Sequence, residues 1–138
     1  MATLSGHPLV SGTASGAVLK LAEPLSLWGG LEPTTGEIID RRHPQSGIIV
    51  TGRILVMPSG RGSSSASSIL LEAVRLHTAP AAIITSEIDG ILALGAVVAR
   101  EMYSVAPPLL VVNAEDYERL GDGQQVTINS HGEVSFQP

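Results

Sequence analysis

The residues from 53 to 77 form the pattern in this chain that is best suited to chemistry. An apolar run at 54–57 is typical of a short buried strand, and residues 58–62 (PSGRG) break it as a loop. Three serines at 63–65 follow, and apolar residues then recur at helical spacing from Ala66. The sequence therefore predicts a glycine-rich loop that leads into the start of a helix, with a serine at the cap.

The start of a helix favours anions and oxygens that become anionic. Its first backbone N–H groups have no partner within the helix, and the helix dipole places partial positive charge there. Gly60 and Gly62 allow close approach of the backbone, and Arg61 offers a guanidinium to a carboxylate or phosphate. Serine is also a common N-cap and glycine a common loop residue, so the pattern alone leaves simple capping as open as catalysis.

The loop departs from three motifs that bind phosphates or carry a nucleophile. No lysine follows the glycines as in a Walker loop, and Ser65 stands where a dinucleotide fingerprint has its third glycine. Ala66 stands where a Gly-x-Ser-x-Gly elbow has its second glycine. No His-Glu-x-x-His or similar metal spacing occurs. A Ser-His-Asp hydrolase stays open, because the members of such a triad lie far apart in a sequence.

Composition limits the classes of function and the compartment. The chain has 138 residues, of which 43% are apolar and 15% charged, as expected of one folded domain. A net charge of -5 argues against nucleic acid as a partner. The absence of cysteine excludes disulfides, a cysteine nucleophile and metal sites built on thiolates of this chain. We find no signal-peptide pattern and no apolar run near the roughly 20 residues of a membrane helix, so we expect a cytoplasmic protein without a membrane partner.

The elements that must position the loop alternate in type along the chain. Strands are predicted near 8–11 and 16–21, then at 54–57, 81–85 and 109–112, and in a hairpin over 125–136. Helices are predicted over 63–77, from a capping box at 86–89 to about 101 with Ile88 and Met102 on its buried face, and for one or two turns over 114–120. This order predicts a mixed α/β domain with a parallel segment and added antiparallel strands.

A long segment over residues 23–52 is predicted to be irregular, because proline and glycine punctuate it throughout. It contains Asp40, Arg42 and His43 close together. These polar groups are expected to form a local hydrogen-bonded turn that fixes the segment, and contact with a substrate is the alternative.

Four stretches together resemble the small subunit of the aconitase X family. They are PLSLWGG (24–30), RRHPQSG (41–47), GRILVMPSGRGSSSAS (52–67) and APAAIITSEIDGILALGAVVA (79–99). The resemblance extends from about residue 5 to residue 113. It implies an α/β fold of the aconitase-like swivelling β/β/α kind, in which a mixed barrel-like sheet carries two main helices, and it implies that residues 1–138 form a single swivel domain.

The resemblance also implies an activity and a partner. Aconitase-type enzymes are hydro-lyases in which a large part holds an iron–sulfur cluster and a swivel domain moves against it. This chain resembles the swivel encoded separately, so it is expected to be a dehydratase only together with a large catalytic subunit of the aconitase X type. The cofactor is then expected in that large subunit, where the cluster iron acts as a Lewis acid on the departing hydroxyl, and none is expected on this chain.

The resemblance assigns roles to the loop. Aconitase carries a Gly-x-Gly-Ser-Ser loop at a helix start, and its first serine is the base. Residues 60–64 match this loop, so Ser63 is the expected base. The neighbouring candidates for binding the substrate are Gly60, Arg61, Gly62, Ser64 and Ser65. Aconitase has an arginine where this chain has Ser65, which leaves Arg61 as the candidate for the substrate carboxylate.

Two small anionic substrates are associated with the family. Bacterial members dehydrate cis-3-hydroxy-L-proline to Δ1-pyrroline-2-carboxylate, and archaeal members dehydrate mevalonate 5-phosphate. The stretches SSSAS and PLSLWGG favour the former. A phosphate would need added basic groups, for which Arg61, Arg53 and the pair Arg41-Arg42 are the candidates. A non-catalytic, stand-alone binding domain remains a further alternative, and binding of a large subunit would decide against it.

Overall fold

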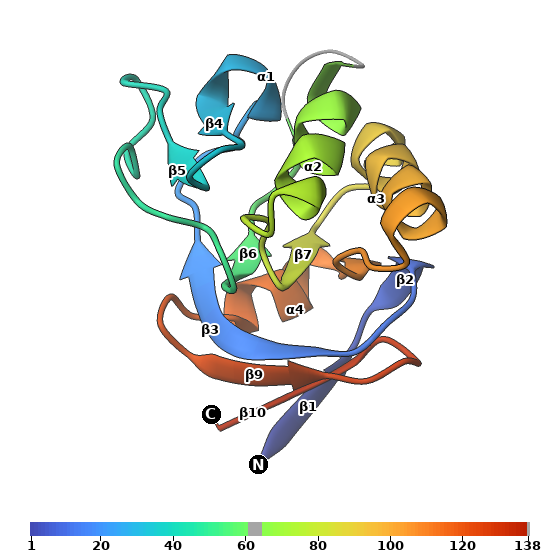
Figure 1. The fold of residues 1–138 in the computed structure, drawn as a ribbon. Helices are drawn as coiled ribbons and strands as arrows, with labels where there is room; N and C mark the ends of the chain where they lie inside the picture. The colour runs from blue at the N-terminus through green and yellow to red at the C-terminus, as the bar shows by residue number, and fades with distance from the viewer. Residues whose placement is uncertain (61–64, 138) are drawn as a thin grey trace.

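The computed structural model describes residues 1–60 and 65–137, and in this part of the chain a curved sheet of eight strands is the main element (Figure 1). Its strands are β1 (Ala2–Ser5), β2 (His7–Val10), β3 (Ala14–Lys20), β6 (Ile54–Val56), β7 (Ala82–Thr85), β8 (Leu109–Val111), β9 (Gln125–Ile128) and β10 (Glu133–Phe136). They lie in the order β1-β10-β9-β3-β6-β7-β8-β2. The first strand, β1, was not expected from the sequence.

The sheet is parallel at its centre and antiparallel at both sides. Strands β3, β6, β7 and β8 pair in parallel, with Ile54 opposite both Val18 and Ala82. Both β6 and β7 are buried along their whole length, as expected of parallel strands covered on both faces. Strand β3 pairs antiparallel with β9 through its first half and parallel with β6 through its second, so it joins the two parts. Strands β1 and β2 lie at opposite edges of the sheet but are consecutive in the chain, joined by Gly6, so the two edges meet and the sheet is nearly closed. The Gly6 N–H donates to the Gly132 carbonyl at 2.8 Å at this point. The predicted mixed, barrel-like sheet is confirmed.

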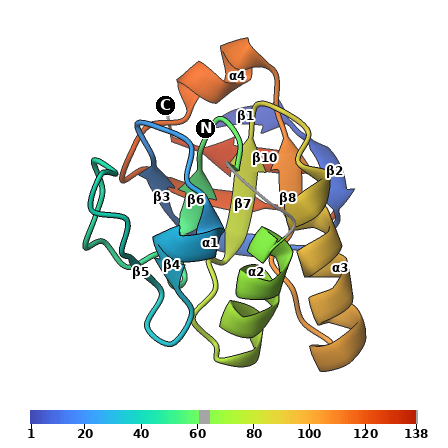
Figure 2. The same cartoon turned by 90° about the horizontal axis from the view of Figure 1, so that it is seen from above.

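Two helices cover one face of the parallel strands. They are α2 (Ser65–Arg75) and α3 (Gly90–Tyr103), and Figure 2 shows them side by side. Gly95 allows their close approach, because a Cβ on it would lie 2.8 Å from the carbonyl oxygen of Ser67. A short helix, α4 (Ala114–Arg119), lies away from them, and its Tyr117 packs in the core on the other side of the sheet.

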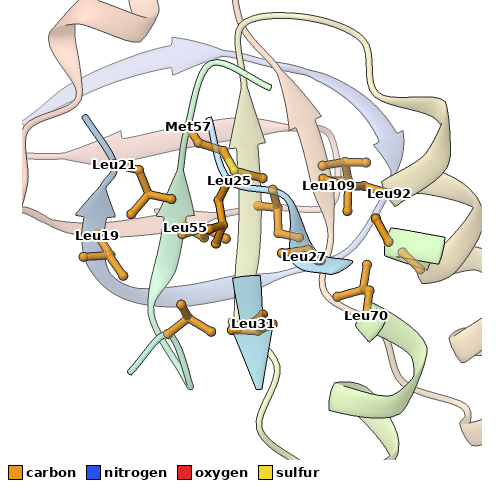
Figure 3. Close-up of a cluster of buried hydrophobic side chains, with 14 of the residues drawn as sticks. Leu19, Leu21, Leu25, Leu27, Leu31, Leu55, Met57, Leu70, Leu92 and Leu109 are labelled. Atoms are coloured by element: carbon orange, nitrogen blue, oxygen red, sulfur yellow. The ribbon is translucent and has the colours of Figure 1, made fainter. Parts of the chain in front are cut away.

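Alternation along the central strands produces two separate cores. Leu55 and Ile83 face the helices, and their strand neighbours Ile54 and Ile84 face the interior of the curved sheet. The core under the helices is made mainly of leucines from distant parts of the chain, as Figure 3 shows: Leu19, Leu21, Leu25, Leu27, Leu31, Leu55, Leu70, Leu92 and Leu109, together with Met57. Ala66 in the first turn of α2 and Leu92 in the first turn of α3 both pack in this core, which fixes the position of both helix starts.

The segment over residues 23–52 is more ordered than the sequence suggested. It contains α1 (Leu27–Gly30) and a separate two-stranded sheet of β4 (Leu31–Glu32) and β5 (Glu37–Ile38). Its leucines enter the core under the helices, so tertiary contacts order a stretch that is rich in proline and glycine. The prediction of an irregular loop was therefore wrong for this part.

The start of α3 also differs from the predicted capping box. The N-cap is Asp89, whose Oδ1 accepts the N–H groups of Ile91 at 3.1 Å and Leu92 at 3.0 Å. Ser86, the predicted cap, donates its hydroxyl to the Pro58 carbonyl at 3.3 Å instead. The helix thus begins at Gly90, and Ile88 lies outside it with 74% of its surface exposed. Met102, also predicted on the buried face, is exposed as well.

Candidate functional site

A hollow of about 290 Å³ lies beyond the carboxyl ends of β6 and β7. Its walls include Leu25, Leu27, Gly60, Glu87, Asp89 and Ile91, and we refer to it as the hollow. Helix α3 begins at its edge with Gly90, and Ala66 in the first turn of α2 also lines it. Open α/β sheets bind ligands at this end of their parallel strands.

Two of the sequence-predicted site residues are described, Gly60 and Ser65, and of these Gly60 lines the hollow. Ser65 is the first residue of α2, beside Ala66. Four of the predicted residues lie outside the described part of the chain: Arg61, Gly62, Ser63 and Ser64. The assignment of Ser63 as base and of the others to substrate binding therefore stays a prediction.

Asp89 holds Gly60 in place. Its Oδ2 accepts the Gly60 N–H at 3.0 Å, while its Oδ1 caps α3. Gly60 also forms a parallel bridge with Leu25 from the 23–52 segment. A Cβ on Gly60 would lie 2.5 Å from Asp89 Oδ2, so a side chain at this point would displace the carboxylate that accepts the Gly60 N–H. One carboxylate thus joins the loop after β6 to the start of α3, a role that sequence reasoning did not assign to it.

The turn after β7 is fixed against the turn after β6. The Pro58 carbonyl accepts the N–H groups of Ser86 at 3.1 Å and Glu87 at 3.2 Å. The fully buried Thr85 donates its hydroxyl to the Glu87 carbonyl at 2.7 Å. The turns that follow β6 and β7 are therefore hydrogen-bonded to each other, and the backbone of Glu87 is fixed in position.

Electrostatics at the hollow combine helix starts with carboxylates. The partial positive charge at the start of α3 is compensated by the Asp89 carboxylate that caps it, and the start of α2 lies beside the hollow at Ala66. Among the described lining residues, Glu87 and Asp89 are charged and there is no lysine, arginine or histidine. In residues 1–60 and 65–137, no group of three or more His, Asp or Glu side chains is arranged to hold a metal ion. The same residues contain no helix of the length and apolarity that crossing a membrane requires.

The polar cluster in the 23–52 segment is a local turn, as predicted. His43 is buried, with its Nε2 3.1 Å from the Glu23 carbonyl and its Nδ1 accepting the Gln45 N–H at 3.0 Å. Asp40 Oδ1 accepts the Arg42 N–H at 3.0 Å. These bonds fix the segment beside Glu23.

Arg53, proposed above as a basic group for a phosphate, lies far from the hollow along its strand. It precedes β6, at the opposite end from Gly60, and its Nη2 donates to the Val18 carbonyl at 3.3 Å. The structure therefore does not bring Arg53 to the predicted site.

Together, the nearly closed mixed sheet, the paired helices on one face and the hollow at their starts define a swivelling β/β/α domain of the aconitase type. A family model described as the aconitase X swivel domain matches residues 3–136. The chain belongs to this family.

Relatives carry two different names. The cis-3-hydroxy-L-proline dehydratase of Pseudomonas aeruginosa is 46% identical over 123 residues, which cover 84% of this chain and 21% of that protein. The phosphomevalonate dehydratase small subunit of Methanosarcina mazei is 34% identical over 124 residues, 90% of this chain and 83% of the relative. The crystal structure of Thermococcus kodakaraensis aconitase X (holo-form) matches with a TM-score of 0.89 and 32% identity, covering 100% of both chains. The chain thus spans about a fifth of the length of the hydroxyproline dehydratases that it matches, 21% and 22%.

Proposed function

We propose that this chain is the small subunit of a heteromeric hydro-lyase and supplies its serine base. The observation that carries the proposal is the convergence of Gly60 and the first turn of α2 on the hollow, because residues 61–64 connect these two points. Names of relatives support the reaction class, since both kinds are dehydratases, and the name "small subunit" supports a large partner. The whole enzyme's activity and substrate belong to this proposal.

Ser63 takes the substrate proton in this proposal. A serine hydroxyl is a weak base until the alkoxide is stabilised, and the partial positive charge at a helix start supplies such stabilisation. The proton removed lies α to the substrate carboxylate, and Arg61 pairs with that carboxylate. The chain has no cysteine, so its residues do not fit an iron–sulfur cluster, and a cluster would be held by the large subunit.

The substrate that we propose is cis-3-hydroxy-L-proline, which gives Δ1-pyrroline-2-carboxylate. Two hydroxyproline dehydratases are 46% identical over 123 residues and 42% over 130 residues, and this supports the choice. Among the phosphomevalonate dehydratase small subunits, that of Methanosarcina mazei is 34% identical over 124 residues, and that of Methanothermobacter thermautotrophicus reaches 42% over a shorter match of 88 residues. Mevalonate 5-phosphate is the second candidate. It is supported by the relatives named phosphomevalonate dehydratase small subunit, among them that of Pyrococcus furiosus, which is 34% identical over 134 residues.

Co-purification with a large subunit of the aconitase X type, followed by assays on both substrates, tests the proposal. We expect a stable complex that dehydrates cis-3-hydroxy-L-proline, with neither chain active alone. Turnover of mevalonate 5-phosphate instead would keep the split dehydratase and change its substrate. If no complex forms, the chain is better explained as a stand-alone binding domain, and the proposal fails.

Ser63→Ala tests the base within that complex. We expect loss of dehydration without loss of assembly, since the hydroxyl is needed for the proton transfer only. Ser130→Ala, an exposed serine in the β9–β10 turn, is the matched control and should keep full activity. Normal turnover by Ser63→Ala would remove this serine from the mechanism.

A further inference from the structure

Two carboxylates among the described lining residues of the hollow have different surroundings. Asp89 accepts three backbone N–H groups, from Gly60, Ile91 and Leu92, and is committed to the fold. The exposed Glu87 carboxylate makes no hydrogen bond or ion pair with any residue in 1–60 or 65–137, although its backbone is fixed at both its N–H and its carbonyl. Glu87 therefore presents an available negative charge from a rigid position.

The rest of the described wall combines apolar side chains with Ser59 and with glycine backbone. Leu25, Leu27, Ile91 and Leu92 line the hollow, and no cationic side chain of the described residues does. A volume of about 290 Å³ suits a small ligand. The wall thus offers apolar side chains to a ring and the Glu87 carboxylate to a cation. The start of α2 offers partial positive charge to an anion, whereas the start of α3 is already capped by Asp89.

We propose that Glu87 binds the ring ammonium of a small cyclic amino acid in the hollow. This inference rests on the proposed function and deepens it, because it states what selects the substrate class. A zwitterionic amino acid matches the arrangement, with its ammonium at Glu87, its ring methylenes on apolar lining side chains such as Ile91 and its carboxylate toward the start of α2. A phosphorylated substrate has no cation for Glu87 and would place further negative charge beside it.

The test compares the wild-type complex with Glu87→Gln, a neutral side chain of the same shape. Glu133→Gln is the matched control, because Glu133 is also exposed but lies on β10, away from the hollow. Steady-state kinetics on cis-3-hydroxy-L-proline are combined with competitive inhibition by two ligands that differ in one atom. L-Proline carries the ring ammonium, and tetrahydrofuran-2-carboxylate has an ether oxygen in its place.

We expect Glu87→Gln to raise KM for hydroxyproline and Ki for L-proline about tenfold, as for loss of a hydrogen bond to a charged group. The Ki of tetrahydrofuran-2-carboxylate and all constants of Glu133→Gln should stay unchanged. Suppose that the wild-type complex is active on hydroxyproline. If Glu87→Gln then leaves KM and the Ki of L-proline unchanged, or raises the Ki of both inhibitors equally, the role of Glu87 is refuted and the proposed function stands. A wild-type complex without activity on hydroxyproline would overturn the proposed substrate and this inference together.

Discussion

Replacing Asp89 measures how strongly one side chain holds the hollow together. Asp89→Ala removes the N-cap of α3, which costs about 1 kcal/mol. It also leaves the Gly60 N–H, now 3.0 Å from Oδ2, without its charged acceptor. A hydrogen bond of this kind contributes about 1.5 to 3 kcal/mol, and the lower figure applies because Gly60 is half-exposed and water replaces part of the bond. We therefore expect a loss of about 2.5 kcal/mol in the free energy of unfolding, well within the stability of a domain.

Asp89→Asn separates the two contributions. An asparagine oxygen caps a helix as well as an aspartate oxygen, but its amide NH₂ would face the Gly60 N–H, and two donors cannot bond. We expect a loss of about 1.5 kcal/mol from this variant in urea unfolding, with an unchanged slope. Amide hydrogen exchange should accelerate at Gly60 and stay protected at Leu92, whose N–H is 3.0 Å from Oδ1.

Three results would refute this reasoning. If Asp89→Asn is as stable as the wild type, the bond to Gly60 contributes nothing and the loop is held by other contacts. If Asp89→Asn and Asp89→Ala lose the same free energy, capping and loop attachment are not separable. Faster exchange at Leu92 than at Gly60 in the asparagine variant would show that the assignment of the two oxygens is wrong.

Three further changes test the packing and one buried ionisable group. Gly95→Ala should cost about 1 to 2 kcal/mol despite its gain in helix propensity, because its Cβ meets Ser67 at 2.8 Å, whereas Gly90→Ala meets nothing within 4 Å and should not destabilise. Leu70→Ala should cost about 2 to 5 kcal/mol in urea unfolding, since this side chain is fully buried between α2 and the sheet. Burial, and to a smaller extent Glu118, raises the pKa of Tyr117 to about 12 from 10.0, so the folded state keeps the phenol proton longer. Stability should therefore be complete below about pH 10 and fall toward pH 12, and the fall should be smaller in Tyr117→Phe; an equal fall in both proteins would contradict this.

The central strands could be predicted because each is a continuous apolar run. Parallel strands covered on both faces need no polar side, so residues 54–57, 81–85 and 109–112 stand out in the sequence. The 23–52 segment could not be predicted in the same way. Its order comes from leucines that meet a distant core and from strands of two residues, too short for any periodic pattern.

The sequence predicted the loop at the site, but it did not predict that Asp89 holds this loop in place. The approach of Gly60 to a helix start follows from a local pattern of glycines and serines. The position of the helix cap does not, because both Ser86 and Asp89 are good caps and the carbonyl of Pro58, 28 residues before Ser86, decides between them. Glu87 and Leu25 come from different loops, so their meeting at one hollow becomes visible only when the strands are paired.

The pairing of β1 with β10 places the two chain ends side by side. Ala2 lies opposite Phe136, and Figure 1 shows both ends on the side of the molecule away from α1 and the start of α2. Additional protein can therefore be joined to either end without crossing the hollow. This makes the domain a portable module, which accords with its occurrence both as about a fifth of a longer dehydratase and as a small subunit. For the same reason, a single-chain fusion through either end is a practical way to hold this domain near a large subunit.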